Sequence, residues 1–418
     1  MPDMFHEFWI NFTHNLFKPL LLFFYMGFLI PLLKVPFEFP KIIYQGLTIY
    51  LLISIGWHGG EELATLSASG FLQALGFIVI GFITNTLIGF LAYQVLRRGT
   101  RLRQVDAMMV GGYYGSDSAG TFVTCLGVLS AAQIAYAPYM PVLLAVMEIP
   151  GCLVALLLIA RLRRKGMDEA GNMPGEAGYH APEAVAADEH AFASEPLIDE
   201  MASVRQTGRH PVQYALAGDG TATVATIPQP TTDSFSDHGE AVFSGKMLHE
   251  VFFNPGLYLL FGGIIIGFVS RLQGEQVVAA DDALFVDLFH GALCLFLLEM
   301  GMAACSRLRD LKSAGWQFIA FCLLAPMVFA AIGLCVAHSY SMLLGQPFEI
   351  GTYALFAVLC AAASYIAVPA VQRLAVPEAS PTLPLAASLG LTFTFNVTIG
   401  IPLYIEVAKL LVRTLPVA

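Results

Sequence analysis

The sequence predicts an all-α integral membrane protein with ten transmembrane helices, arranged as an inverted repeat of five and five. Three observations predict this fold class. Hydrophobic residues make up 57% of the 418-residue chain and charged residues only 12%, against roughly 25% charged in an ordinary soluble domain. Ten apolar runs are each suited to a bilayer core, which takes about 20 residues as a helix. A hydrophilic stretch divides these runs into two similar sets.

The ten runs follow one another with short connections, apart from the hydrophilic stretch in the middle. The first five are Leu16–Leu33, Ile42–Trp57, Phe71–Leu96, Asp106–Leu129 and Pro141–Ala160. The second five are Phe252–Val269, Leu284–Ala304, Trp316–Tyr340, Tyr353–Leu374 and Pro384–Leu411. Because His6 and Glu7 stand where a signal peptide would be basic, we expect the first run to be a span.

The hydrophilic stretch predicts a domain organisation of two five-helix repeats joined by a linker. The repeats are expected at residues 1–162 and 248–418, with a mostly disordered cytoplasmic linker at 163–247. Between Gly166 and Gly245 there are 13 acidic residues and two basic ones, Arg205 and Arg209, so this stretch has a net charge of −11. The net charge of the whole chain is −10, so the rest of the chain is close to neutral. The acidity of the chain therefore belongs to one segment and says nothing about a basic ligand elsewhere.

The basic residues predict how the chain is oriented. Loops after odd-numbered spans carry fourteen Lys or Arg, and the opposite side carries four. Cytoplasmic loops are enriched in Lys and Arg. We therefore expect a cytoplasmic linker and both termini outside.

The two halves resemble each other at nearly constant spacing. Leu52–Trp57 aligns with Leu297–Met302 at an offset of 245, and Gly70 aligns with Gly315 at the same offset. After five spans the chain is on the opposite side of the membrane from where it began. The second half therefore starts from that side and has the inverted orientation. Inverted repeats are typical of secondary transporters, whose binding sites lie near the midplane where helices break.

Two spans carry interruptions at comparable places. Between Val110 and Thr121 the fourth span holds four Gly, three Ser or Thr and one acid. The ninth span contains Pro369, which removes a backbone amide, and its Ser364 stands 248 residues after Ser116. Helix amino ends favour anions and carbonyl ends favour cations. The alternatives are a small-residue packing surface in the fourth span and a packing kink in the ninth.

Asp117 is the strongest single candidate for a functional residue. A carboxylate at the centre of a span costs about 2.5–3.5 kcal/mol on insertion scales, so it needs a cation, a proton or a basic partner. No Lys or Arg lies in the middle of a predicted span, which favours a bound Na⁺. The alternative is a protonated, hydrogen-bonded acid. Glu148, just before a proline in the fifth span, is either part of the same site or a structural acid.

Enzyme chemistry finds no support in the sequence. It contains no GxSxG, HExxH or Walker motif, and an intramembrane aspartyl protease would need a second central aspartate. The seven cysteines form no CxxC pair and lie mostly in apolar runs, which is typical of helix packing. We therefore expect no enzyme activity and no organic cofactor.

At these residues the sequence resembles the bacterial sodium-dependent bicarbonate transporter family, the SbtA-type permeases, in its proteobacterial-like branch. The resemblance covers all ten spans. The segments that carry it are Asp106-Ala107 with Gly111-Gly112 and Gly115 to Thr121, then Met147–Pro150, Leu298–Met302 with Ser306-Arg307, and Ser364–Ile366 with Pro369, Arg373, Pro377 and Pro381. The cyanobacterial form differs, with an aspartate where Tyr365 stands and an apolar residue where Asp117 stands.

The resemblance implies a symporter of the bacterial inner membrane that imports bicarbonate by alternating access, with Na⁺ as the coupling ion. It also implies a core domain moving against a gate domain, a homotrimer, and a PII-like cytoplasmic regulator. The predicted bicarbonate-binding residues are Gly115, Ser116, Ser118, Thr121, Ser364 and Tyr365. The predicted sodium site consists of Asp117, Ser118 and Glu148. The alternatives are a Na⁺ symporter of another small anion, such as a monocarboxylate, and a membrane receptor for a PII-like protein.

Overall fold

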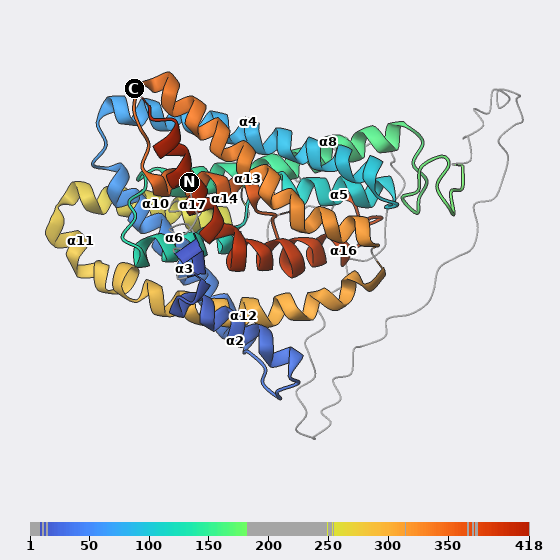
Figure 1. The fold of residues 1–418 in the computed structure, drawn as a ribbon, viewed down its shortest axis with the longest axis horizontal. Coiled ribbons are helices and arrows are strands. Elements are labelled where there is room, and N and C mark those ends of the chain that lie inside the picture. The colour runs from blue at the N-terminus through green and yellow to red at the C-terminus, as the bar shows by residue number, and fades with distance from the viewer. Residues whose placement is uncertain are drawn as a thin grey trace, which may run out of the picture. The chain divides into compact units, whose positions relative to one another are not determined.

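The computed structural model describes most of the chain on both sides of the central hydrophilic stretch. The described residues are 9–10, 12–13, 16–181, 249, 253, 255–313, 315–365, 368–369, 372 and 375–417. They form helices and connecting turns, without a strand in these ranges (Figure 1). One compact unit is built from chain before residue 183 and after residue 241. The rest of the predicted linker, from residue 182 to residue 247, lies outside the described residues.

Helices occupy most of the described part of each predicted apolar run, with non-helical residues inside the fourth and ninth runs. The helices of the first half are α2 (Pro19–Leu32), α3 (Lys41–Leu63), α4 (Ala68–Gly99), α5 (Gln104–Tyr114), α6 (Ala119–Ala131), α7 (Met140–Met147) and α8 (Ile149–Arg164). Those of the second half are α10 (Pro255–Gln273), α11 (Glu275–Asp282), α12 (Phe289–Arg307), α13 (Trp316–Leu344), α14 (Ile350–Ala361), α16 (Leu383–Leu385) and α17 (Ile401–Thr414). Three short π-helical segments (η1, Ala283–Asp287; η3, Ala386–Phe393; η4, Asn396–Gly400) and a 3₁₀ turn (η2, Leu308–Ser313) complete them.

Length and composition mark several of these helices as membrane spans. Within the described part, six continuous helical segments are long and apolar enough to cross a membrane: Ala68–Gly99, Met140–Arg164, Pro255–Gln273, Glu275–Arg307, Trp316–Leu344 and Leu383–Thr414. Two shorter apolar helices, α2 and α14, accompany them. The outer faces of α4 and α10 expose large apolar side chains such as Leu72 and Ile265, as expected where lipid is the solvent. The chain is therefore an all-helical, multi-pass membrane protein.

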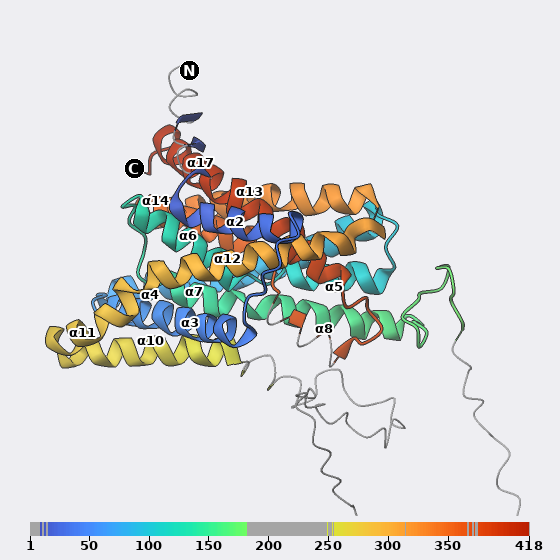
Figure 2. The same cartoon turned by 90° about the horizontal axis from the view of Figure 1, so that it is seen from below.

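Two helix pairs cross at glycines, and each pair joins one helix of the first half to one of the second. In the α3–α10 pair, a Cβ added to Gly56 would lie 2.4 Å from the carbonyl oxygen of Leu260. In the α2–α12 pair, a Cβ on Gly301 would lie 2.2 Å from the carbonyl oxygen of Phe24. Only glycine permits such close backbone contact. Figure 2 shows α3 beside α10 and α2 beside α12.

Helix α5 is buried on all sides. Every residue from Val105 to Tyr114 is buried, although the segment has no amphipathic pattern. A helix that is apolar all round belongs in the interior of a bundle. Its neighbours are α4 and α8 on one side and the segment around α16 on another. This position places the end of α5 deep inside the protein.

The first part of the predicted linker is ordered. Helix α8 continues to Arg164, and residues 165–181 form a loop held by carboxylates that bind backbone amides. Asp168 accepts from the amides of Asn172 (2.6 Å) and His180 (2.9 Å), and Glu176 accepts from those of Gln104 (2.8 Å) and Met173 (2.9 Å). Composition did not reveal this order, because these acids bond to the chain itself rather than to solvent.

Candidate functional site

The fourth predicted span breaks at the residues singled out in the sequence. Helix α5 ends at Tyr114, α6 begins at Ala119, and the four residues between them are not helical. Ser118 caps α6: its Oγ accepts from the amide of Thr121 at 3.3 Å and from its hydroxyl at 2.9 Å. The amino end of α6, with its partial positive charge, therefore opens at a buried break.

Close packing of glycines fixes the position of this break. A Cβ on Gly115 would lie 2.9 Å from the Cα of Gly89 on α4 and 3.2 Å from the Cα of Gly151 on α8. A Cβ on Gly151 would come within 2.1 Å of the carbonyl oxygen of Gly112. The end of α5 is thus wedged between α4 and α8, which explains why small residues crowd this stretch.

The ninth predicted span also breaks, and its break contacts the first one. Helix α14 ends at Ala361, and the amide of Ser364 donates to the carbonyl oxygen of Tyr113 at 2.8 Å. The Oγ of Ser364 accepts from the amide of Val368 at 3.5 Å, as Ser118 does from Thr121 in α6. The two interruptions, 248 residues apart in sequence, therefore meet in the interior. Ile366 and Ala367 lie outside the described residues.

The carboxylate of Asp117 is buried at this meeting point. Its side chain is 1% exposed, and neither oxygen has a hydrogen-bond partner among the described residues. Glu148 and Cys360 lie close enough to interact with it electrostatically. The buried Oδ1 of Asn85 likewise has no donor in the described part. Buried acceptors without donors are rare and costly, so this region suits a cation or a proton.

Glu148 stands at the junction of α7 and α8, beside the first break. Its backbone carbonyl accepts from the hydroxyl of Ser116 at 2.7 Å, and the carbonyl of Met147 accepts from the Nδ2 of Asn85 at 3.1 Å. Its carboxylate acts electrostatically on both Asp117 and Tyr365. These three side chains therefore share one electrostatic environment.

Tyr365 extends from the second break over the amino end of α6. A Cβ placed on Gly120 would lie 1.9 Å from the tyrosine hydroxyl oxygen, and the hydroxyl also lies near Ser118. Its ring packs edge-on against Phe393 with centroids 5.7 Å apart. The glycine at position 120 leaves the space that this side chain occupies.

The predicted site residues all lie at or beside the two breaks, but in different roles. Gly115 packs against α4 and α8. The hydroxyl hydrogens of Ser116 and Thr121 are donated to Glu148 and Ser118, so these two residues offer a ligand only their oxygens in this conformation. The hydroxyls of Ser118, Ser364 and Tyr365 therefore become the better candidates as donors to an anion.

Two amides support the site: Asn85, which sequence reasoning missed, and Asn396, which it left in the tenth span without a role. Asn85 fixes the α7–α8 junction, as described above. Asn396 donates to the carbonyl of Ala361 at 3.0 Å, at the end of α14, and accepts from the hydroxyl of Tyr404 at 2.8 Å. Both amides interrupt otherwise apolar runs. The argument that identified Asp117, the cost of a polar group in the middle of a span, would have identified them as well.

A second polar cluster, also missed, connects the start of α5 to the segment after the second break. The carboxylate of Asp106 accepts from Arg103 (Nε 2.8 Å, Nη2 3.1 Å) and from the amide of Ser380 (2.7 Å). Arg163 binds the carboxylate of Glu378 at 2.9 Å. Charge-assisted bonds of this kind are strong. They hold the segments leading to the two breaks in a fixed relation.

Comparison with known proteins gives the family. No curated protein matches the chain. A family model described as the Na⁺-dependent bicarbonate transporter superfamily matches residues 19–409. The match includes both halves of the chain and both helix breaks. The chain therefore belongs to the Na⁺-dependent bicarbonate transporter superfamily.

Proposed function

We propose that this protein is a symporter that imports bicarbonate together with Na⁺, by alternating access across the bacterial inner membrane. The observation that carries the proposal is the carboxylate of Asp117, buried at a helix break without a hydrogen-bond donor. A coupling cation supplies the missing charge, and the family to which the chain belongs is Na⁺-dependent. Homotrimer formation and a PII-like regulator remain predictions from the family resemblance.

For Na⁺, the proposed ligands are the carboxylate of Asp117, the hydroxyl of Ser118 and, nearby, the carboxylate of Glu148. Among the described residues, no three His, Cys, Asp or Glu side chains are grouped to hold a metal ion. A monovalent cation at this place would therefore take much of its coordination from hydroxyl and carbonyl oxygens. The carbonyl ends of α5 and α14, which both stop at the breaks, supply such oxygens.

For bicarbonate, the proposed site is the amino end of α6, with the hydroxyls of Ser118, Ser364 and Tyr365 as donors. The oxygens of Ser116 and Thr121 lie in the same region and can accept the single O–H of bicarbonate. An anion held there and a cation at Asp117 attract each other, so each raises the affinity for the other. This reciprocal coupling is what symport requires.

The inverted repeat is part of the proposal, because alternating access rests on it. The glycine crossings support it. In the repeat, α2 corresponds to α10 and α3 corresponds to α12. The α2–α12 pair and the α10–α3 pair are therefore equivalent when the two halves are exchanged. The crossing residues Gly56 and Gly301 stand at the offset of 245 found in the sequence. We propose that α2, α3, α10 and α12 form the gate domain, and that the helices around α5 form the core domain.

Uptake of labelled bicarbonate into proteoliposomes tests the proposed function. An inward Na⁺ gradient should drive accumulation, and the same gradient of K⁺ should not. Labelled acetate under both gradients serves as the test for a monocarboxylate. Bicarbonate uptake at the same rate with and without a Na⁺ gradient would refute symport. Na⁺-driven uptake of acetate without uptake of bicarbonate would show that the substrate is another anion. No partner protein is present, so positive transport also argues against a receptor as the sole role.

A further inference from the structure

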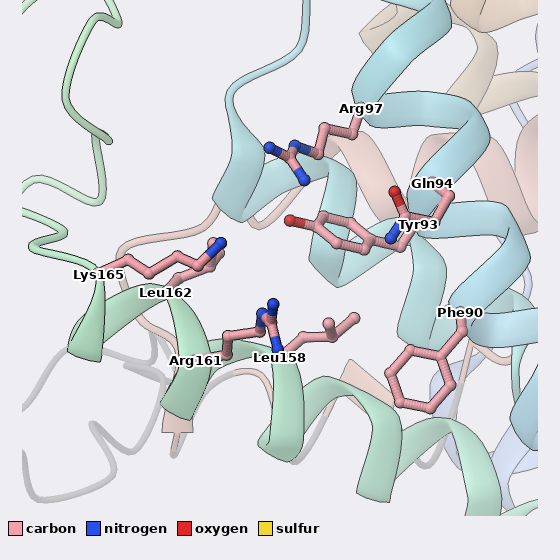
Figure 3. Close-up of a pocket in the computed structure, with 8 residues that line it drawn as sticks. All are labelled: Phe90, Tyr93, Gln94, Arg97, Leu158, Arg161, Leu162 and Lys165. Atoms are coloured by element: carbon pink, nitrogen blue, oxygen red, sulfur yellow. The ribbon is translucent and has the colours of Figure 1, made fainter.

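A basic pocket lies between the last turns of α4 and α8, and none of its residues belongs to the two breaks (Figure 3). Its volume is about 230 Å³. Its walls combine three cationic side chains with aromatic and aliphatic ones: Phe90, Tyr93, Gln94, Arg97, Leu158, Arg161, Leu162 and Lys165. The helices contribute these residues at spacings of three and four, so each presents one face to the pocket.

Within the described ranges, the three cations of the pocket have no anionic partner. Arg97, Arg161 and Lys165 form no ion pair with any described residue, whereas Arg103 and Arg163 do. Among the described acids, Glu176 acts electrostatically on Tyr93 of the pocket, and its two oxygens already accept backbone amides. Three unpaired positive charges around one hollow attract an anion with several oxygens.

The chemistry of the pocket favours a phosphate over other anions. Arginine presents a planar fork of donors that matches phosphate oxygens. In Figure 3 the Tyr93 hydroxyl lies between Arg97 and the side chains of Arg161 and Lys165, and Gln94 lines the pocket at the other end of the tyrosine ring. Neutral donors among cations are suited to a phosphate diester, which carries one charge over several oxygens.

Exposed apolar side chains neighbour the pocket residues along the same two helices. Phe90 and Leu158 line the pocket itself. Next to them in the helices, Leu87, Leu91 and Leu157 are 62%, 40% and 46% exposed. A ligand that fills the pocket and lies along this surface must have an anionic head and apolar chains. Basic pockets between membrane helices are known to hold anionic lipid head groups.

We propose that this pocket binds the phosphate of an anionic phospholipid, whose acyl chains lie along Leu87, Leu91 and Leu157. The site is separate from the proposed Na⁺ and bicarbonate sites, and its occupancy does not depend on either. A lipid held there would join the ends of α4 and α8, the two helices between which α5 is wedged. The lipid therefore stabilises the framework of the transport site without contacting the substrates.

Melting of the purified full chain in neutral detergent, at increasing concentrations of added lipid, tests the proposal. Phosphatidylglycerol should raise the melting temperature, and phosphatidylcholine with the same acyl chains should not. The variant R97Q/R161Q should weaken the apparent affinity for phosphatidylglycerol roughly 30-fold, equivalent to about 1 kcal/mol for each cation. The control R98Q/R164Q removes two exposed arginines from the same helix ends but not from the pocket, and should bind as the unmodified chain does.

Two further measurements, on the variant R97K/R161K and with inorganic phosphate in place of lipid, complete the test. The variant R97K/R161K retains both charges, so it should retain most of the affinity even if R97Q/R161Q folds poorly. Inorganic phosphate without lipid should give no stabilisation, because it lacks the apolar chains. Equal losses in R97Q/R161Q and R98Q/R164Q would overturn the proposal in favour of a general surface-charge effect. Equal stabilisation by phosphatidylcholine, or by inorganic phosphate alone, would also overturn it.

Discussion

Asp117 shows what a single residue can reveal in a chain of this kind. Its carboxylate lies where two interrupted helices meet, with no donor for either oxygen among the described residues. The backbone around it is held by bonds that do not involve it, from Ser116 to Glu148 and from Ser364 to Tyr113. The acid is therefore not needed to build the break, which is why we assign it a role in binding a cation.

We expect Asp117→Asn to weaken Na⁺ affinity while leaving the fold intact. Coulomb attraction over about 3 Å amounts to roughly 5 kcal/mol at an effective dielectric constant near 20, and part of it is offset by dehydration. A net loss of about 2–3 kcal/mol would weaken Na⁺ binding on the order of 30- to 150-fold. The measurement is the Na⁺ concentration that gives half-maximal bicarbonate uptake. Glu299→Gln, another acid within an apolar run, is the control. An unshifted half-saturation point would remove Asp117 from the site and make Glu148 the next candidate.

A second prediction concerns the contact between Gly120 and Tyr365. In Gly120→Ala the new Cβ would meet the tyrosine hydroxyl at 1.9 Å, so the side chain must move away. Losing one hydrogen bond to bicarbonate costs about 1 kcal/mol, or roughly fivefold in apparent affinity. Tyr365→Phe should lose the same amount, and the double variant no more than either single one. Gly262→Ala, with nothing within 4 Å, is the control. Fully additive losses would contradict the shared contact.

At the scale of elements, the molecule depends on helices that touch backbone to backbone. Helix α5 is wedged between α4 and α8, and the α2–α12 and α3–α10 pairs cross at glycines. Contacts of this kind provide association where lipid removes the hydrophobic driving force between helices. At the end of α5 the carbonyl oxygen of Tyr113 accepts from the amide of Ser364, so the second break satisfies a backbone group that the first one leaves without a helical partner.

We expect Gly151→Ala to destabilise the α5–α8 contact. Its Cβ would lie 2.1 Å from the carbonyl oxygen of Gly112, and neither backbone can yield easily. Overpacking of this sort costs about 1–3 kcal/mol. Thermal unfolding in detergent measures the effect, with Gly262→Ala as the matched substitution at an open position. Equal melting temperatures for the two variants would show that α5 and α8 can separate at no cost.

The polar cluster at the start of α5 allows a prediction for a second element, the segment from residue 375 to residue 380. Asp106 is 6% exposed and accepts three hydrogen bonds. Asp106→Asn replaces an acceptor with a donor, and a buried polar group left unsatisfied costs about 1–3 kcal/mol. Hydrogen exchange at residues 376–380 should therefore become faster. Glu275→Gln, in an exposed ion pair with Arg271, should change nothing measurable. Unchanged exchange in Asp106→Asn would mean that other contacts hold the segment.

At the scale of the whole molecule, composition and family agree. The scarcity of charge predicted a membrane protein, and several helices long and apolar enough to span a bilayer confirm it. The prediction that the chain is not an enzyme is confirmed by its family, which is one of transporters.

We expect a chain lacking residues 183–241, with the ends rejoined through a flexible Gly/Ser linker, to transport bicarbonate at an unchanged Na⁺ half-saturation. The reason is that one compact unit is built from the chain on either side of these residues. Proteoliposome uptake and detergent melting are the measurements. Asp168→Ala, within the ordered loop before the deletion, should lower the melting temperature because Asn172 and His180 lose their acceptor. A deletion variant that no longer folds would show that the removed residues belong to the folded unit.

The sequence by itself determined where the helices lie and where two of them break. In lipid every backbone amide and carbonyl must be bonded within its own segment, so apolar length alone locates a helix, and Gly, Ser and Asp in mid-span locate an interruption. Asp117, Ser118 and Ser364 were singled out in this way, and Tyr365 by the family resemblance. Hydropathy, however, describes each run separately and says nothing about which faces meet.

Only the tertiary structure decided how these pieces are combined. It joined Ser364 to Tyr113 across 251 positions of sequence, committed the hydroxyl of Ser116 to Glu148, and placed Tyr365 in the space left by Gly120. It also ordered the loop after α8, where composition predicted disorder. The physical reason is the same in each case: hydrogen bonds and close backbone contacts depend on distances between segments, and these are set by how the helices pack against one another.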